Sequence, residues 1–124
     1  MFDLEDIKRI AHEVGFDLCG VAQCRKLEQD SAFLRQWLEQ GFGGPLEYLK
    51  KNVERRGDAT SLVEGAESVI VCAVSYKNAI SGGYPCSQKA KIASYACNVD
   101  YHRTIKDMLF EMCHRMKAVD ADFS

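Results

Sequence analysis

The stretch from Ser68 to Tyr76 reads SVIVCAVSY, and it constrains the fold more than any other part of the chain. Its residues are β-branched or otherwise apolar almost without interruption, a pattern typical of a strand that is covered on both faces. A central strand of this kind needs neighbouring strands on both sides. The pattern therefore predicts a sheet with this segment buried in its interior.

The rest of the chain offers few partners for that strand. Only Phe16 to Ala22, FDLCGVA, is also short and apolar enough to be a strand. Helices are predicted where apolar residues recur every three or four positions, at 4–14, at 31–40 and at 105–116, with Asp100 as an N-cap or first-turn residue of the last one. The predicted class is α/β (α+β), with an incomplete sheet flanked by helices. Two strands leave a sheet unfinished, which indicates a fragment or a chain that pairs with something else.

Local signals place the ends of these elements. Asp3 can cap the first helix, and Gly15 can end it in a left-handed turn. Residues 46–52 are expected to form a short helical turn, and residues 58–66 a loop that enters another short helix. Residues 78–87 contain two glycines and a proline, which favour a loop.

Composition excludes several classes of function. The chain has 124 residues, enough for one domain, and a net charge of −2, so it lacks the basic excess of a domain that grips nucleic acid alone. No signal peptide and no apolar run of roughly 20 residues is present, so we expect a cytoplasmic protein with no membrane partner. The six cysteines are expected to be mostly buried, reduced thiols. They form no C-x-x-C motif, so no metal ligands are predicted.

Residues 91–106 read KIASYACNVDYHRTIK and gather polar side chains where a loop enters the last helix. Tyr95, Asp100, Tyr101 and His102 are the candidate binding residues, because helix N-termini and scaffold-held loops often bind ligands. Plainer roles are open: Asp100 as a helix cap, the tyrosines as packing aromatics, and His102 as a residue bonded to backbone. A catalytic pair of Cys97 with His102 would be five residues apart across a helix start, with no third orienting residue. A metal site built from the three histidines and carboxylates lacks ligand spacing.

Four segments together resemble the N-terminal region of epoxyqueuosine reductases. They occur in order, with fitting spacing, and span most of the chain: GFDLCGVA, WLEQGFGGPLEYL, RRGDATSLVEGAESVIV and IASYACNVDYHRTIKDML. The run Asp100, Tyr101 and His102 anchors the match. The resemblance implies that residues 1–124 are the N-terminal part of a larger cobalamin- and substrate-binding domain, with the iron–sulfur domain absent from this chain.

The resemblance also implies an activity, namely the reduction of epoxyqueuosine in tRNA to queuosine. Members of the family use cobalamin and two [4Fe–4S] clusters, and they receive electrons from an external donor. Tyr95, Asp100, Tyr101 and His102 match the motif that shapes the cobalamin and substrate pocket. The cluster ligands and the proton donor of the family fall beyond Ser124, so we expect this chain to be inactive alone and assign it no catalytic residue.

The chain departs from the family pattern at three positions near the motif. Ser94 stands where an arginine is common, and Asn98 and Val99 replace a glycine and a basic residue. An alternative of another class is a non-catalytic α/β binding or assembly module. The incomplete sheet and the missing catalytic constellation favour that alternative, and it predicts a stable oligomer.

Overall fold

The computed structural model describes residues 3–77 and 92–121 of the chain. The chain divides into two compact units. The first unit combines Met1–Gly20 with Val71–Ser124, and the second is Val21–Ile70. Each unit has its own architecture, and the candidate functional residues all belong to the first.

The first unit opens with helix α1, Leu4–Val14. Its boundaries are those that the sequence predicts. The side chain of Asp3 accepts a hydrogen bond from the backbone N–H of Asp6 at 2.8 Å, which satisfies one of the free donors of the first turn. Gly15 ends the helix with φ of 115°, a left-handed conformation that favours glycine.

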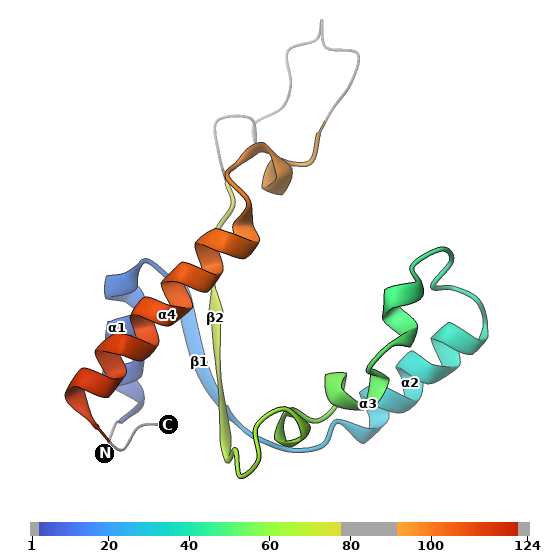
Figure 1. Cartoon of the computed structure of the whole chain (residues 1–124), viewed down its shortest axis with the longest axis horizontal. Coiled ribbons are helices and arrows are strands. Elements are labelled where there is room, and N and C mark those ends of the chain that lie inside the picture. Colours follow the sequence, from blue (N-terminus) through green and yellow to red (C-terminus); the bar gives the residue numbers. More distant parts are fainter. Residues whose placement is uncertain (1–2, 78–91, 122–124) are drawn as a thin grey trace, which may run out of the picture. The chain divides into compact units, whose positions relative to one another are not determined.

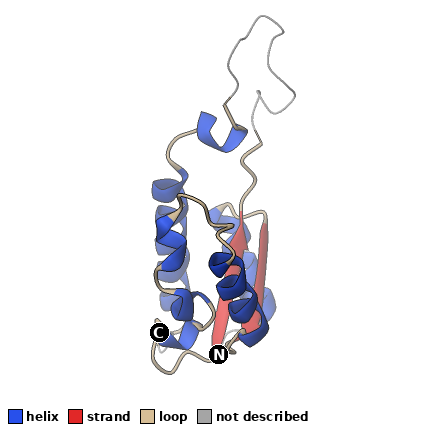
Figure 2. Cartoon of the chain, turned by 90° about the vertical axis from the view of Figure 1, so that its right-hand side faces the viewer, coloured by secondary structure: helices blue, strands red, loops and turns tan. Residues whose placement is uncertain are grey.

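The sheet consists of two strands, β1 (Leu18–Gln23) and β2 (Ser68–Ala73). They run antiparallel, because the backbone N–H of Asp17 donates to the carbonyl of Ala73 at 2.9 Å while that of Cys24 donates to Glu67 at 2.8 Å. Figure 2 shows the two red strands side by side. Within the described part of the chain, the predicted incomplete sheet is therefore confirmed.

The prediction that β2 is buried on both faces is wrong. No residue of β2 is fully buried, and Val71 is 58% exposed. The reason is that β1 is the only strand paired with it among the described residues. An apolar strand is suited to burial, but it becomes buried only where other helices or strands pack against both of its faces.

Helix α4, Tyr101–Val119, supplies the other wall of the first unit. Its buried residues Met112 and Met116 lie one turn apart, as the apolar periodicity predicts. Figure 1 shows α1 and α4 next to each other beside the strands. The core is formed by these buried apolar residues: Ile10, Ala11, Phe16, Met112 and Met116.

The second unit is built from short helical elements. Helix α2 covers Glu28–Glu39, followed by the 3₁₀ turn Glu47–Lys50, helix α3 (Val53–Arg56) and the 3₁₀ turn Ala59–Ser61. Helix α2 begins three residues before the predicted start, with acidic residues in its first turn, where they complement the helix dipole. The short helix α3 is absent from the sequence prediction.

The cysteines differ from expectation in their burial. Five of them are free thiols, as predicted, but four are only half-buried and Cys113 is exposed. The sixth, Cys86, and the predicted loop at residues 78–87 lie outside the described residues. Among the helices of the described ranges, none has the length and apolarity that crossing a membrane requires.

Candidate functional site

The candidate residues lie where a 3₁₀ turn, Ser94–Cys97, leads into helix α4. Tyr95 belongs to that turn, Asp100 is the N-cap of α4, and Tyr101 is its first residue. The helix is anchored in the core by Met112 and Met116, so its first turn has a defined position in the first unit.

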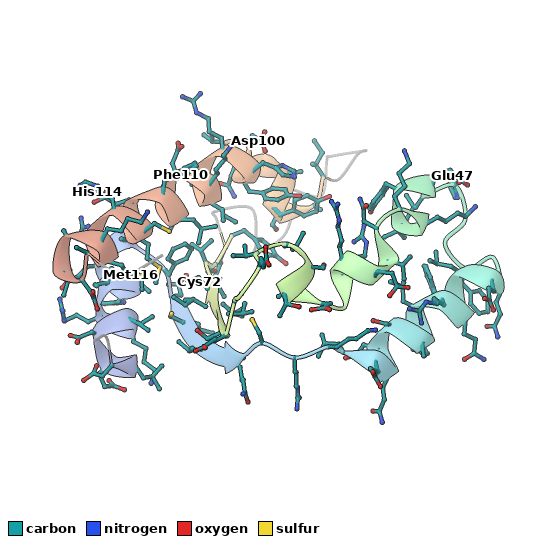
Figure 3. The ribbon with its side chains drawn as sticks, turned by 60° about the horizontal axis from the view of Figure 1, so that its bottom comes forward. Glu47, Cys72, Asp100, Phe110, His114 and Met116 are labelled. Atoms are coloured by element: carbon teal, nitrogen blue, oxygen red, sulfur yellow. The ribbon has the colours of Figure 1, made fainter. Side chains whose placement is uncertain are left out.

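Asp100 caps helix α4 through one carboxylate oxygen. Its Oδ1 accepts a hydrogen bond from the backbone N–H of His102 at 3.0 Å, and Nδ1 of the His102 ring lies 3.0 Å from the same oxygen. The side-chain and backbone hydrogen bonds from His102 lower the pKa of Asp100 below its ordinary value. The plainer role considered for Asp100, that of a helix cap, is confirmed. Figure 3 labels Asp100 at this end of the helix.

Three tyrosines form a ladder of edge-to-face ring contacts, which we call the tyrosine ladder. The ring centroids of Tyr76 and Tyr95 are 6.3 Å apart with an interplanar angle of 80°, and those of Tyr95 and Tyr101 are 6.1 Å apart at 77°. The His102 ring stacks on Tyr101 with centroids 4.1 Å apart. Such T-shaped pairs are a favoured aromatic geometry, and they link the segment after β2 to the 3₁₀ turn and to the start of α4.

An open cavity of about 690 Å³ lies against the tyrosine ladder. This volume is within the range of small-molecule sites, roughly 300–1,000 Å³, which are mostly apolar with a few polar groups. The lining has that character, with aromatic and aliphatic side chains beside a few amide, hydroxyl and amino groups. It is formed by Val74, Ser75, Tyr76, Lys77, Tyr95, Asn98, Val99, Tyr101, Thr104 and Ile105.

The structure separates the four predicted residues into two pairs. Tyr95 and Tyr101 line the cavity, whereas Asp100 and His102 lie outside its lining and bond to each other. Contact of these residues with a cofactor stays a prediction. Chemically, the ring faces of the tyrosines offer apolar surface, and their hydroxyls offer donors and acceptors.

Sequence reasoning missed the part of the lining that follows β2. The sequence pattern predicts Tyr76 as the end of a strand, whereas its ring contacts Tyr95 and its carbonyl lies 3.5 Å from the side-chain nitrogen of Asn98. Asn98 also donates to the carbonyl of Ser94 at 3.5 Å. The chain pattern carries no signal for the two contacts of Tyr76, because they join segments about twenty residues apart.

The described residues do not form the catalytic pair of Cys97 with His102. The Cys97 thiol donates to the carbonyls of Ala93 and Ile92, at 3.5 Å and 3.9 Å. The ring of His102 faces Asp100 instead. In the described part of the chain, no three His, Cys, Asp or Glu side chains are grouped so that they could hold a metal ion.

Comparison with known proteins finds relatives that are described as epoxyqueuosine reductases. It is 35% identical over 117 residues to an epoxyqueuosine reductase of Cyclobacterium marinum, covering 90% of this chain and 36% of the relative. The epoxyqueuosine reductases of Leadbetterella byssophila and Gloeobacter violaceus are each 33% identical, covering 91% and 92% of this chain and 36% and 35% of the relatives. The chain thus spans about a third of the length of these curated relatives. No solved structure matches it.

A family model agrees with these relatives. The model described as "Epoxyqueuosine reductase QueG, DUF1730" matches residues 56–123, which is more than half of the chain. Every residue that lines the cavity falls within the matched range. The resemblance seen in the sequence motifs is confirmed, and the chain belongs to the epoxyqueuosine reductase QueG family.

Proposed function

We propose that this chain serves in the reduction of epoxyqueuosine in tRNA to queuosine, and that the cavity against the tyrosine ladder is part of the pocket for cofactor or substrate. The observation that carries the proposal is the coincidence of the family match with the cavity: the lining residues all lie inside residues 56–123. The partners in this proposal are a tRNA that carries epoxyqueuosine and an external electron donor, acting in the cytoplasm.

Cobalamin is the cofactor that the family implies, and the cavity suits one part of it. A corrin ring offers apolar faces and a rim of amide side chains. Tyr95 and Tyr101 would pack against a face of the ring, while Ser75, Asn98 and Thr104 would exchange hydrogen bonds with its amides. When bound, cobalamin supplies the reducing chemistry, and the residues of this chain would position it.

The described residues do not fit the [4Fe–4S] clusters that the family implies. Such clusters are held mainly by cysteine thiolates in closely spaced runs. The described parts of the chain bring no three thiol, imidazole or carboxylate ligands together. In our proposal the cluster ligands and the proton donor belong to other parts of the whole protein, and this chain alone is inactive.

The activity is tested on the whole protein. Purified anaerobically with cobalamin and a chemical reductant, it should convert epoxyqueuosine in tRNA to queuosine, measured by mass spectrometry of the digested nucleosides. The 124-residue chain under the same conditions should give no queuosine. A whole protein with both clusters and cobalamin loaded that gives no queuosine would contradict the proposed activity.

The pocket is tested separately, by titrating the 124-residue chain and the whole protein with cobalamin and following absorbance. Tyr95→Ala and Tyr101→Ala should each weaken binding roughly 2- to 10-fold, because each removes one aromatic contact. Tyr95→Phe should keep the affinity if the ring face makes the contact. Tyr48→Ala, an exposed tyrosine of the second unit, is the matched control. Equal affinity for all variants would remove the cavity from the cofactor site.

A further inference from the structure

Three sulfur atoms meet where the strands and helix α4 of the first unit come together. The Sγ atom of Cys72, on β2, lies 3.8 Å from Sγ of Cys19, on β1. The same atom lies 3.8 Å from Sδ of Met112, on α4. Figure 3 labels Cys72 on its strand. The proposed reaction uses none of these side chains, and no sequence motif marks them.

The three residues differ in their access to solvent. Met112 is 3% exposed, while the two cysteines are half-buried. Burial, followed by the hydrogen bond and charge of the neighbouring Cys19, raises the pKa of Cys72 to about 11. Cys72 therefore lies between the buried Met112 and the half-buried Cys19.

The two separations decide which chemistry the cluster suits. A disulfide requires sulfur atoms about 2.05 Å apart, so the pair is reduced. Two sulfur ligands on opposite sides of a metal, with bonds of about 2.3 Å, would lie about 4.6 Å apart. Three in a plane around it at the same bond length would lie about 4.0 Å apart, and ligands at the corners of a tetrahedron about 3.8 Å apart. The 3.8 Å from Cys72 to Cys19 and to Met112 is close to both of these arrangements and too short for ligands on opposite sides of a metal.

The ligand set then selects the metal. Thiolates and thioethers are soft ligands that favour Cu(I), whereas Ca²⁺ and Mg²⁺ take oxygen ligands. Zinc sites use thiolate, imidazole or carboxylate, and a buried methionine sulfur is none of these. We propose that Cys19, Cys72 and Met112 form a binding site for a single Cu(I) ion. Binding releases the two thiol protons to solvent and transfers no electrons, so the metal remains monovalent.

The ion would join β1, β2 and α4 through one side chain from each. Because only the folded unit brings the three sulfurs together, binding would stabilise the fold by mass action. The site is separate from the cavity, whose lining includes none of these residues. The inference therefore goes beyond the proposed function, and neither cobalamin nor tRNA is needed to test it.

The test uses the 124-residue chain in which Cys24, Cys86, Cys97 and Cys113 are replaced by serine. This leaves only the two cysteines of the cluster. Under anaerobic conditions, Cu(I) is titrated in competition with a chromogenic chelator. We expect one equivalent to bind, with three sulfur neighbours at about 2.3 Å by X-ray absorption. Ag(I), which is redox-inert, should compete for the same site.

Matched variants separate the three ligands. Cys19→Ser and Cys72→Ser should each lower the Cu(I) affinity at least 100-fold, and Met112→Leu, which keeps the apolar volume, about tenfold. Met116→Leu is the control, because it changes a buried methionine of the same helix that belongs to no sulfur pair given above. Circular dichroism checks that each variant is folded.

Several outcomes would overturn the site. They are an affinity unchanged by Cys72→Ser, an affinity unchanged by Met112→Leu, and a metal with only two sulfur neighbours. If a serine variant does not fold, the absorption spectrum of the parent chain and the Met112→Leu variant still decide the question. Rapid formation of a Cys19–Cys72 disulfide in air, without Cu(I) binding under nitrogen, would show a redox pair instead.

Discussion

The two units of the chain differ in the interactions that stabilise each of them. The first contains all five buried apolar residues of the described ranges. In the described second unit the only buried side chain is the small hydroxyl of Ser31, and large apolar residues such as Phe33, Phe42 and Leu62 are more than 60% exposed. The first unit therefore draws its stability from apolar burial, at roughly 25 cal/mol per Å².

The second unit relies on backbone hydrogen bonds and exposed polar contacts. Gly57 packs against Ser31, and its carbonyl accepts a hydrogen bond from the backbone N–H of Leu27 at 2.8 Å. Arg35 and Glu54 form an ion pair with both side chains well exposed. Exposed pairs of this kind contribute little to stability. Secondary structure alone therefore does not make a core, and we expect the second unit to open more easily than the first.

Removing a buried side chain should give the largest effect. Met116 is 1% exposed, so Met116→Ala should lower the free energy of unfolding by about 2–5 kcal/mol, through lost burial and the cavity left behind. Phe33→Ala in the second unit should change it by less than about 0.5 kcal/mol, although phenylalanine is the larger side chain. Urea unfolding followed by circular dichroism measures both. Equal losses would contradict the contrast between the units.

Amide hydrogen exchange should show the same contrast without mutation. We expect the central amides of α4 to exchange at least about 100-fold more slowly than those of α3, because protection follows the free energy of local opening. Mass spectrometry of peptic peptides, or NMR, gives the rates. Similar protection in α3 and α4 would mean that the whole chain opens as one cooperative unit.

A substitution at the contact between Ser31 and Gly57 should destabilise the second unit. A Cβ at position 57 would collide with Ser31 Oγ and lie 3.3 Å from its Cβ. Gly57→Ala should therefore cost about 1–3 kcal/mol as overpacking. Ser31→Ala in the same chain should recover part of the loss by removing the hydroxyl. Ser61→Ala is the control, because it removes a serine hydroxyl from the 3₁₀ turn Ala59–Ser61 and should not recover the lost stability of Gly57→Ala.

The cap of α4 should have a smaller effect than the core. Asp100→Ala removes the acceptor for the backbone N–H of His102 and should lower the ratio of folded to unfolded chain about fivefold. Asp100→Asn should be nearly neutral, because asparagine caps equally well. Thermal melts compare the two. If both variants also weakened cobalamin binding, Asp100 would have a role in the pocket beyond the cap.

Acidification should give the smallest change. The pKa of Asp100 is lowered in the folded chain, so its contribution to stability is present above the ordinary value of 3.8 and is lost as the pH falls through the folded pKa. Wild type should therefore lose more stability than Asp100→Asn between pH 5 and pH 3. Denaturant melts at the two pH values measure the difference. A parallel loss in both proteins would assign the acid sensitivity to other carboxylates.

Much of the fold and half of the site were predictable from local sequence signals. Helix α1 has its predicted cap and its left-handed glycine, and α4 has the predicted apolar period. The segment around Tyr95 and Tyr101 was identified through its motif and lines the cavity. Tyr76 and Asn98 were missed, because nothing in the residues near them indicates a partner in a distant segment.

Local sequence signals are sufficient for helices α1 and α4, for the positions of the two strands and for the family, because periodicity, caps and ordered motifs act over a few residues. Which apolar residues are covered depends on the tertiary structure: Met112 is buried, while Val71 of the most apolar strand is not. The contacts of Cys72 with Cys19 and Met112 depend on it as well. Burial and contact depend on the neighbours that the folded chain supplies, and no local pattern contains that information.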